Sequence, residues 1–314
     1  MQLPQKSDLV AAHERISPLI HRTPVLTSST IDKECGCEIY FKCENFQRAG
    51  SFKIRGATNA ILNLGSEQRE KGIVAHSSGN HAQAVALAAR NVGCKACIAM
   101  PKNAPEVKVA ATKAYDGEVV FCESTAKARQ ALADEIVAQR GSTFIHPSNN
   151  LDVILGQGTA AVELLSKVPD LEFLLTPVGG GGLVAGSSLA AHYFGDQCKT
   201  IGAEPEQVDD AFRSLQSGKI ETNETTNTIC DGLRTFLGDI NFPIIQKHVH
   251  QIITVSEEDI VAAMQLIWQR MKIIVEPSCA VPFAAVRKNP GKFHGCKVGI
   301  ILTGGNVDLK SLPF

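Results

Sequence analysis

The chain has 314 residues, of which 44% are hydrophobic and 20% charged, and its formal net charge is −1. Such a composition is typical of a protein that buries a large core in one large domain or two. The near-zero charge, without long basic or acidic blocks, argues against nucleic acid or a membrane as the main partner.

Short apolar runs alternate with helical patterns along the whole chain. Helical patterns include "NHAQAVALAARNVG", "TAKARQALADEIVAQR" and "SEEDIVAAMQLIWQRMK", the last with Ser256 as its expected N-cap. Because the predicted strands are mostly apolar rather than alternating, we expect an α/β fold with parallel sheets covered on both faces. Strands are predicted at 38–44, 72–77, 95–101, 117–122, 142–147, 171–178, 199–204 and 297–305.

The stretch "AGSFKIRGA" (49–57) places Lys53 in the first turn of a predicted helix, between apolar neighbours. We expect Ser51 to cap this helix. The helix dipole and desolvation both disfavour a charged lysine there, which favours the neutral amine as a nucleophile and base.

Three polar loops follow predicted strands, where α/β proteins bind their ligands. They are "HSSGNH" (76–81), "PVGGGGLVAG" (177–186) and "LTGGN" (302–306). In the second loop, four consecutive glycines precede a helix, so backbone N–H groups and the helix N-terminus would form a phosphate cradle.

Two cofactor classes fit such a cradle. Gly180, Gly182 and Ala185 match the Gly/Ala form of the dinucleotide fingerprint, and Glu204 ends the next strand, where a ribose-binding acid is expected. This keeps an NAD-dependent oxidoreductase open. A lysine, a phosphate cradle and two further polar loops are instead what pyridoxal 5′-phosphate (PLP) requires.

Six motifs together resemble the fold-type II PLP enzymes, in particular the serine racemase and serine/threonine dehydratase family: "SFKIRGA", "SSGNHAQAVALAA", "GQGT", "PVGGGGLVAG", "EPSCA" and "LTGGNVDL". The resemblance covers nearly the whole chain. It implies a tryptophan synthase β-like α/β fold with two open, twisted, mostly parallel sheets flanked by helices. It also implies a large PLP-binding domain (1–65 and 149–314) and a small inserted α/β domain (66–148).

The resemblance assigns a role to each site residue. Lys53 would bond the cofactor and act as the base on one face of the substrate Cα, with Ser78 donating a proton on the other face. Phe52 would pack beside the cofactor ring, Asn80 would bind its hydroxyl oxygen, and Thr303 its nitrogen. The phosphate would be held by Gly179, Gly180, Gly181, Gly182 and Leu183, and the substrate by Ser77, Ser78, Gly79, His81 and Arg129.

Serine at position 78 favours racemisation, because relatives that only eliminate usually carry alanine there. We therefore expect interconversion of L-serine and D-serine, with β-elimination of serine to pyruvate and ammonia. Two alternatives stay open: an L-threonine/L-serine dehydratase, and an ammonia-lyase for threo-3-hydroxyaspartate, whose second carboxylate Arg129 would meet.

The resemblance further implies a divalent cation and a nucleotide. Glu204, the backbone carbonyl of Val208, and Asp210 match an oxygen-ligand site suited to Mg²⁺ or Ca²⁺. Some members bind ATP at a dimer interface, so we expect a homodimer. Arg48 and Ala49 replace the expected Lys and Thr, which weakens the case for ATP. The matching nucleotide positions are Ser28, Ser29, Thr30, Arg48, Gln83 and Tyr115.

The cellular location follows from the cysteines and the N-terminus. The ten cysteines are scattered and lack zinc spacing, and the N-terminal residues show no apolar secretion segment. We expect a cytoplasmic enzyme with reduced thiols and a small amino-acid substrate.

Overall fold

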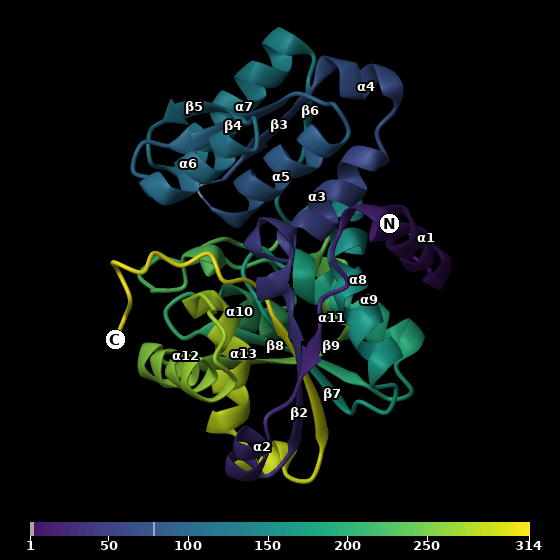
Figure 1. The fold of residues 1–314 in the computed structure, drawn as a ribbon, viewed down its shortest axis with the longest axis vertical. Coiled ribbons are helices and arrows are strands. Elements are labelled where there is room, and N and C mark those ends of the chain that lie inside the picture. The colour runs from purple at the N-terminus through teal and green to yellow at the C-terminus, as the bar shows by residue number, and fades with distance from the viewer. Residues whose placement is uncertain (1–2, 78) are drawn as a thin grey trace.

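The computed structural model describes residues 3–77 and 79–314, and the strands in these ranges form two sheets (Figure 1). Neighbouring strands of the six-stranded sheet are parallel, except that β1 runs antiparallel to β2. In spatial order its strands are β1 (Val25–Leu26), β2 (Glu38–Cys43), β10 (Lys297–Leu302), β7 (Phe173–Pro177), β8 (Lys199–Pro205) and β9 (Val249–Val255). The parallel arrangement of the α/β prediction is confirmed.

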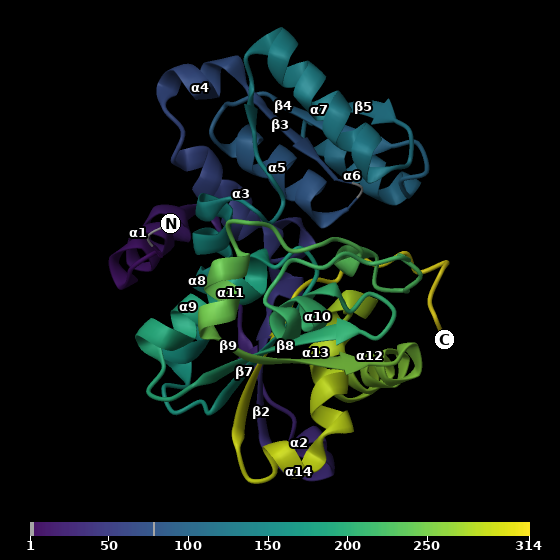
Figure 2. The same ribbon diagram turned by 180° about the vertical axis from the view of Figure 1, so that it is seen from behind.

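The second sheet has four strands, all parallel, and with its helices it occupies one end of the molecule (Figure 2). Its strands lie within the segment predicted as the small inserted domain, whose boundaries stay a prediction. In spatial order they are β5 (Glu118–Cys122), β4 (Ala96–Pro101), β3 (Ile73–His76) and β6 (Thr143–Phe144).

Helices cover both faces of the six-stranded sheet. One core joins Leu164, Leu174 and Leu189 on the first face, and another joins Phe283 and Ile300 on the second. The first face carries α1 (Lys6–Ile16), α8 (Leu151–Lys167), α9 (Gly182–Phe194) and α11 (Phe242–His248), and the second carries α12 (Glu257–Met271) and α13 (Pro277–Lys288).

Helix α3 (Lys53–Leu62) packs against both α5 (Asn80–Asn91) and α8, so it links the two sheets. Helix α7 (Ala126–Arg140) covers the other face of the small sheet, where Ile136 packs near Val74. No described helix is long and apolar enough to cross a membrane. The remaining helices are α2 (Ser29–Cys35), α4 (Ser66–Lys71), α6 (Glu106–Ala114), α10 (Asp210–Ser217) and α14 (Pro290–Phe293).

Every predicted strand overlaps an observed one, although β6 is only two residues long. Ser256 caps α12 as expected, with its hydroxyl accepting from the Asp259 N–H at 3.2 Å. Strand β9 was not predicted, because it is an edge strand whose polar His250 and Gln251 interrupt its apolar run.

Candidate active site

Lys53 is the first residue of α3, and its side chain is half-buried. Its Nζ donates a 2.9 Å hydrogen bond to the carbonyl oxygen of Pro147 and lies 5.2 Å from the centre of the Phe52 ring. Some of the side chain remains accessible, but desolvation lowers the pKa of Lys53 to about 8, against the opposing charge of Glu276. The neutral amine is therefore accessible near neutral pH, as a nucleophile or base requires.

Ser51 does not cap α3, so that prediction was wrong. The residue preceding the helix is Phe52, and the buried Oγ of Ser51 has no hydrogen-bond partner among the described residues. Ser51 instead forms a β-bridge with Gly304, and the Phe52 N–H donates to the Thr303 carbonyl at 2.9 Å. The start of α3 is thus held by the "LTGGN" loop.

The hydroxyl of Thr303 is placed as expected for a group that binds a ligand. Thr303 is 2% exposed, yet its Oγ1 finds no partner in the part of the chain that the structure describes. Buried hydroxyls without partners are rare, because leaving one unsatisfied costs about 1–3 kcal/mol. A ring nitrogen at this place would satisfy the hydroxyl.

Asn80, the first residue of α5, is oriented by two neighbours. Its Nδ2 donates to Glu276 Oε1 at 2.7 Å, and its Oδ1 accepts from Asn306 Nδ2 at 2.9 Å. Asn306 Nδ2 also donates to the carbonyl of Ala49 at 2.8 Å. Asn306 therefore ties together three predicted motifs and, with Glu276, fixes the orientation of the Asn80 amide.

Glu276 is a site residue for which the sequence suggested no role, although "EPSCA" was among the motifs. It is 3% exposed, and burial, followed by the charge of Asp231, raises its pKa to about 7. Its Oε2 has no partner among the described residues. Glu276 thus holds Asn80 and places a titratable oxygen near Lys53.

The glycine loop adopts a turn that larger residues could not. Gly181 has φ +80°, and α9 begins at Gly182. A Cβ on Gly180 would lie 2.3 Å from Ser148 Oγ, and one on Gly182 would lie 2.9 Å from the Ser148 carbonyl oxygen. The loop therefore presents bare backbone at a helix N-terminus, the arrangement that binds phosphate.

This cradle adjoins Lys53 through one short segment. Pro147 accepts the hydrogen bond of Lys53, and the next residue, Ser148, packs on Gly180. Gly179 is equally confined, since a Cβ there would lie 2.9 Å from Leu233 Cα. A lysine and an anion cradle thus stand side by side, as a phosphate-bearing aldehyde requires.

The predicted substrate-binding segment, residues 77–81, follows β3 and includes the first two residues of α5. Ser77 Oγ accepts from the Gly79 N–H at 3.1 Å, and the His81 Nε2 lies 3.1 Å from the carbonyl of Ile145. Burial, with the nearby charge of Lys53, lowers the pKa of His81 well below 6.5, so the ring is neutral. Ser78 lies outside the described residues, and its role stays a prediction.

Arg129, on α7, approaches this loop from the small sheet. Its charge depresses the pKa of His76, the last residue of β3, although burial of His76 is the larger cause. Its buried Nε finds no acceptor within residues 3–77 and 79–314. This geometry is compatible with binding an anion at the loop.

The predicted cation site brings two buried carboxylates together. Burial and then Asp210 raise the pKa of Glu204 well above its usual range, and burial raises that of Asp210 to about 7. Asp210 Oδ2 has no partner among the described residues, whereas Glu204 accepts the N–H groups of Ala211 and Phe212 at 3.3 and 2.8 Å. No group of three or more described His, Cys, Asp or Glu side chains could hold a metal, so Val208 would have to supply its carbonyl.

The predicted nucleotide residues do not meet within one chain. Ser28 caps α2, and Ser29 and Thr30 begin it, at the end of the molecule away from the small sheet (Figures 1 and 2). Gln83 lies in α5 and Tyr115 follows α6, both beside the small sheet. A site made from these residues would need a second chain.

A buried ion network lies behind Lys53. Arg55 donates to Glu44 at 2.7 and 2.8 Å, to Glu163 at 2.9 and 2.9 Å, and to Thr159 at 3.0 Å. Lys42 adds a 2.6 Å hydrogen bond to Glu163. Every N–H of the Arg55 guanidinium is used, so α3 is clamped to β2 and α8.

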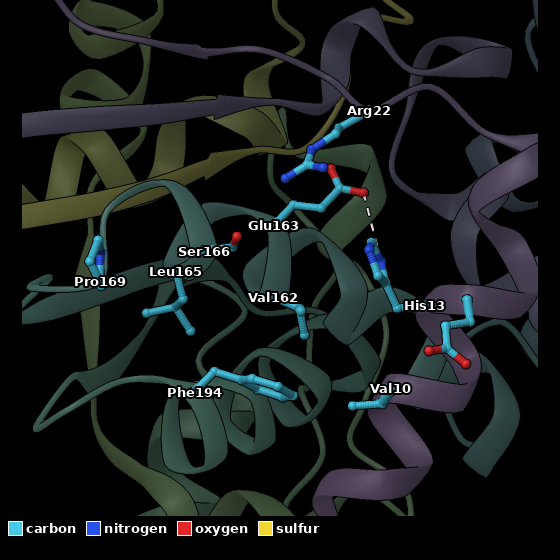
Figure 3. Close-up of a pocket in the computed structure, with 10 residues that line it drawn as sticks. Val10, His13, Arg22, Val162, Glu163, Leu165, Ser166, Pro169 and Phe194 are labelled. Carbon is cyan, nitrogen blue, oxygen red and sulfur yellow. Dashed lines mark ion pairs between the residues drawn. The ribbon is translucent and has the colours of Figure 1, made fainter.

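A cavity of about 490 Å³ between α1 and α8 borders this network (Figure 3). His13 lies 3.9 Å from Glu163 there, with Arg22 nearby and Phe194 and Val162 on the apolar wall. None of the predicted site residues lines it. This cavity is therefore separate from the Lys53 site.

Comparison with known proteins agrees with this geometry. Residues 16–304 match the family model "Pyridoxal-phosphate dependent enzyme". The chain is 48% identical to serine racemase of Dictyostelium discoideum over 310 residues, 97% of this chain and 95% of that one. It is 44% identical to β-hydroxyaspartate dehydratase of Paracoccus denitrificans over the full length of both. The crystal structure of the Dictyostelium racemase superposes with a TM-score of 0.92 at 47% identity, covering 96% of this chain and 98% of that one.

Fold and site thus define an α/β enzyme that holds a phosphate-bearing cofactor beside a lysine. The chain belongs to the family of pyridoxal-phosphate-dependent enzymes, with the fold-type II architecture of its racemase and deaminase neighbours. The family therefore indicates PLP rather than a dinucleotide as the cofactor, and Glu204, the residue expected to bind a ribose, is fully buried.

Proposed function

We propose that this chain is a serine racemase that also eliminates serine to pyruvate and ammonia. The observation that carries the proposal is the hydroxyl of Thr303, which finds no partner among the described residues and lies on the loop that fixes the start of α3 at Lys53. A hydroxyl opposite the ring nitrogen does not enforce ring protonation as a carboxylate would. Both reprotonation of the substrate Cα and elimination of its β-hydroxyl are therefore open to the enzyme. The 48% identical Dictyostelium relative is named a serine racemase.

Each residue would contribute one defined action. When bound, PLP withdraws electrons from the bonds of the amino-acid Cα. Lys53 Nζ, with its pKa near 8, would take the Cα proton on one face. Asn80 and Thr303 would orient the ring, and the 179–183 backbone would hold the phosphate. Ser78, on the basis of the sequence, would return a proton from the other face.

The test is an assay that measures both products. The purified protein, mixed with L-serine or D-serine, should form the other enantiomer and pyruvate. S78A should lose at least about 100-fold in racemisation, a range typical of general acid–base catalysis, while elimination partly survives. K53A should lose the absorbance band at about 410 nm that borohydride abolishes in the wild type. A colourless protein that binds NADH would overturn the proposal.

A second candidate is an ammonia-lyase for threo-3-hydroxyaspartate. The observation favouring it is Arg129, whose buried Nε lacks an acceptor in the described chain, together with the 44% identical β-hydroxyaspartate dehydratase. The same assay with L-threo-3-hydroxyaspartate and L-threonine, read as keto acid released, ranks the substrates. Faster release from either than from L-serine would favour a lyase over the racemase.

We also propose a divalent cation at Glu204, Asp210 and the carbonyl of Val208. Two adjacent buried carboxylates are costly unless a cation compensates them, and hard oxygen ligands suit Mg²⁺ or Ca²⁺. Mg²⁺ at 100 times its dissociation constant should stabilise the protein by about 2.7 kcal/mol. EDTA should lower Tm and Mg²⁺ restore it, and D210N should abolish the response.

We also propose that the protein is a cytoplasmic homodimer and that it binds ATP between its two chains. Helix α2, which Ser28 caps, lies far from α5, which contains Gln83 (Figure 1), and this separation supports a nucleotide site shared by two chains. The ten free cysteines suit a reducing compartment. Sedimentation with and without ATP tests the homodimer and ATP binding: a monomer, or a dimer indifferent to ATP, would contradict the shared site.

A further inference from the structure

Lys108 is a buried lysine that the proposed mechanism leaves unused. It lies in the first turn of α6, and its side chain is only 9% exposed. Its Nζ forms an ion pair with Asp231, the first residue of the short helix η4 (Asp231–Leu233). Since α6 borders the small sheet and η4 belongs to the other half, this pair joins the two halves of the molecule.

The ammonium of Lys108 stands beside the loop expected to hold the substrate carboxylate. A Cβ on Gly79 would lie 3.6 Å from Lys108 Nζ and 3.9 Å from its Cδ. Gly79 directly precedes Asn80, the proposed ligand of the cofactor ring. A positive charge is therefore placed where a substrate would bring negative charge.

The counter-ion of Lys108 is replaceable. The Asp231 side chain is 43% exposed, so water can solvate it when it releases the lysine. Lys108 is enclosed and must keep an anionic partner, because an unpaired buried charge is strongly unfavourable. An anion entering the site would exchange with Asp231 at low cost.

We propose that Lys108 binds the second carboxylate of a dicarboxylic hydroxy-amino acid, and that Asp231 occupies this position in the substrate-free protein. The inference rests on the proposed function and deepens it, because it names a substrate class for the same site. The α-carboxylate, which serine shares, is assigned by the sequence prediction to the 77–81 segment. A β-carboxylate is an extra charge in an enclosed site and needs its own cation.

The test compares substrates that differ by one carboxylate, using the holoenzyme. K108M should reduce kcat/KM for L-threo-3-hydroxyaspartate at least about tenfold more than for L-serine, the size of one lost charged hydrogen bond. K108R should retain the preference. D231N, which leaves the lysine in place, should lower KM for 3-hydroxyaspartate and leave KM for serine nearly unchanged.

A binding measurement gives a readout besides turnover. Succinate, a dicarboxylate without an amino group, should raise the Tm of the wild type and of D231N, but not of K108M. Butyrate, the matched monocarboxylate, should raise Tm in none of them at equal ionic strength.

Two results would overturn the inference. K108M could impair both substrates equally, which would mean that Lys108 only supports the loop. Alternatively, R129M could remove the whole preference and K108M none, which would assign the second carboxylate to Arg129. Failure of the proposed function looks different: no borohydride-sensitive band and no turnover of either substrate, with succinate protection still dependent on Lys108.

Discussion

Arg55 and Lys53, two residues apart on α3, differ in how well their side chains are hydrogen-bonded. Arg55 satisfies every guanidinium N–H with Glu44, Glu163 and Thr159, and these glutamates outweigh its burial and raise its pKa. Lys53 has one hydrogen bond, to a carbonyl, and desolvation lowers its pKa to about 8. Within the first turn of α3, Arg55 thus stabilises the fold, whereas Lys53 lies among groups that have no partner in the described chain.

The unsatisfied groups near Lys53 share a chemical logic. Thr303 Oγ1, Glu276 Oε2 and Ser51 Oγ are buried and have no partner in the described part of the chain. Around Arg55, even the Thr159 hydroxyl both accepts from the guanidinium and donates to the Gly156 carbonyl at 2.6 Å. Other buried groups, such as Thr58 Oγ1, also lack a partner among the described residues, but near Lys53 three of them lie in or beside the 302–306 loop, as expected for a site completed by a ligand.

The largest effect should come from breaking the ion network of Arg55. R55M would leave Glu44 and Glu163 with only Lys42 as a buried cation, and removing one partner of a buried ion pair costs about 3–5 kcal/mol. Urea unfolding of the cofactor-free protein measures this loss. K71M, which removes an exposed pair with Glu67, is the control and should change little. An R55M protein as stable as the wild type would contradict the contrast.

The next effect is the pH dependence of stability that Glu276, near Lys53, should produce. The folded-state pKa of Glu276, about 7, lies above the ordinary value of 4.5, so the folded protein binds more protons than the unfolded chain between these values. Stability should therefore fall as pH rises from about 4.5 to 7, by on the order of 2–3 kcal/mol for this group.

Glu276→Gln should remove that part of the decline, since Gln accepts from Asn80 without ionising. Asp210, also with a pKa near 7, contributes a similar slope in both proteins. Urea unfolding of both proteins at pH 5 and pH 7.5, without cofactor, measures the difference. Parallel losses of stability would show that Glu276 does not carry the slope.

A pair of matched threonines sharpens the comparison at a smaller scale. T159V removes a satisfied buried hydroxyl and should cost about 1–3 kcal/mol, whereas T303V removes a partnerless one and should be neutral or stabilising. Denaturant unfolding of the cofactor-free variants gives both values. T303V should also retain PLP less well on dialysis. Equal losses of stability would mean that the Thr303 hydroxyl is already satisfied.

Much of this contrast could be anticipated from local pattern. The glycine loop, Lys53 and Thr303 each follow a strand or begin a helix, so local pattern places them in the fold, while their roles come from the family resemblance and stay a prediction. Ser51 failed as a cap because the β-bridge to Gly304 replaces the local hydrogen bond. A tertiary contact of that kind leaves no trace in a nine-residue window.

The residues that sequence reasoning missed act across long distances in the chain. Asn306 reaches Ala49 and Asn80, Glu276 reaches Asn80, and Lys108 reaches Asp231. Their amide, carboxylate and ammonium groups look like ordinary surface residues until the fold buries them. Strand β9 was missed for the related reason that an edge strand tolerates polar residues.

The smallest effect lies in the backbone that leads into α3. Ala49 has φ +57°, a left-handed conformation that costs a non-glycine residue about 1 kcal/mol, and Asn306 holds its carbonyl. A49G should relieve this strain and offset the lost methyl contacts, leaving stability within about 0.5 kcal/mol of the wild type. A60G, in the regular interior of the same helix, should cost about 1 kcal/mol or more. If A49G and A60G lower the free energy of unfolding equally, the left-handed conformation of Ala49 does not strain the backbone that leads to Lys53.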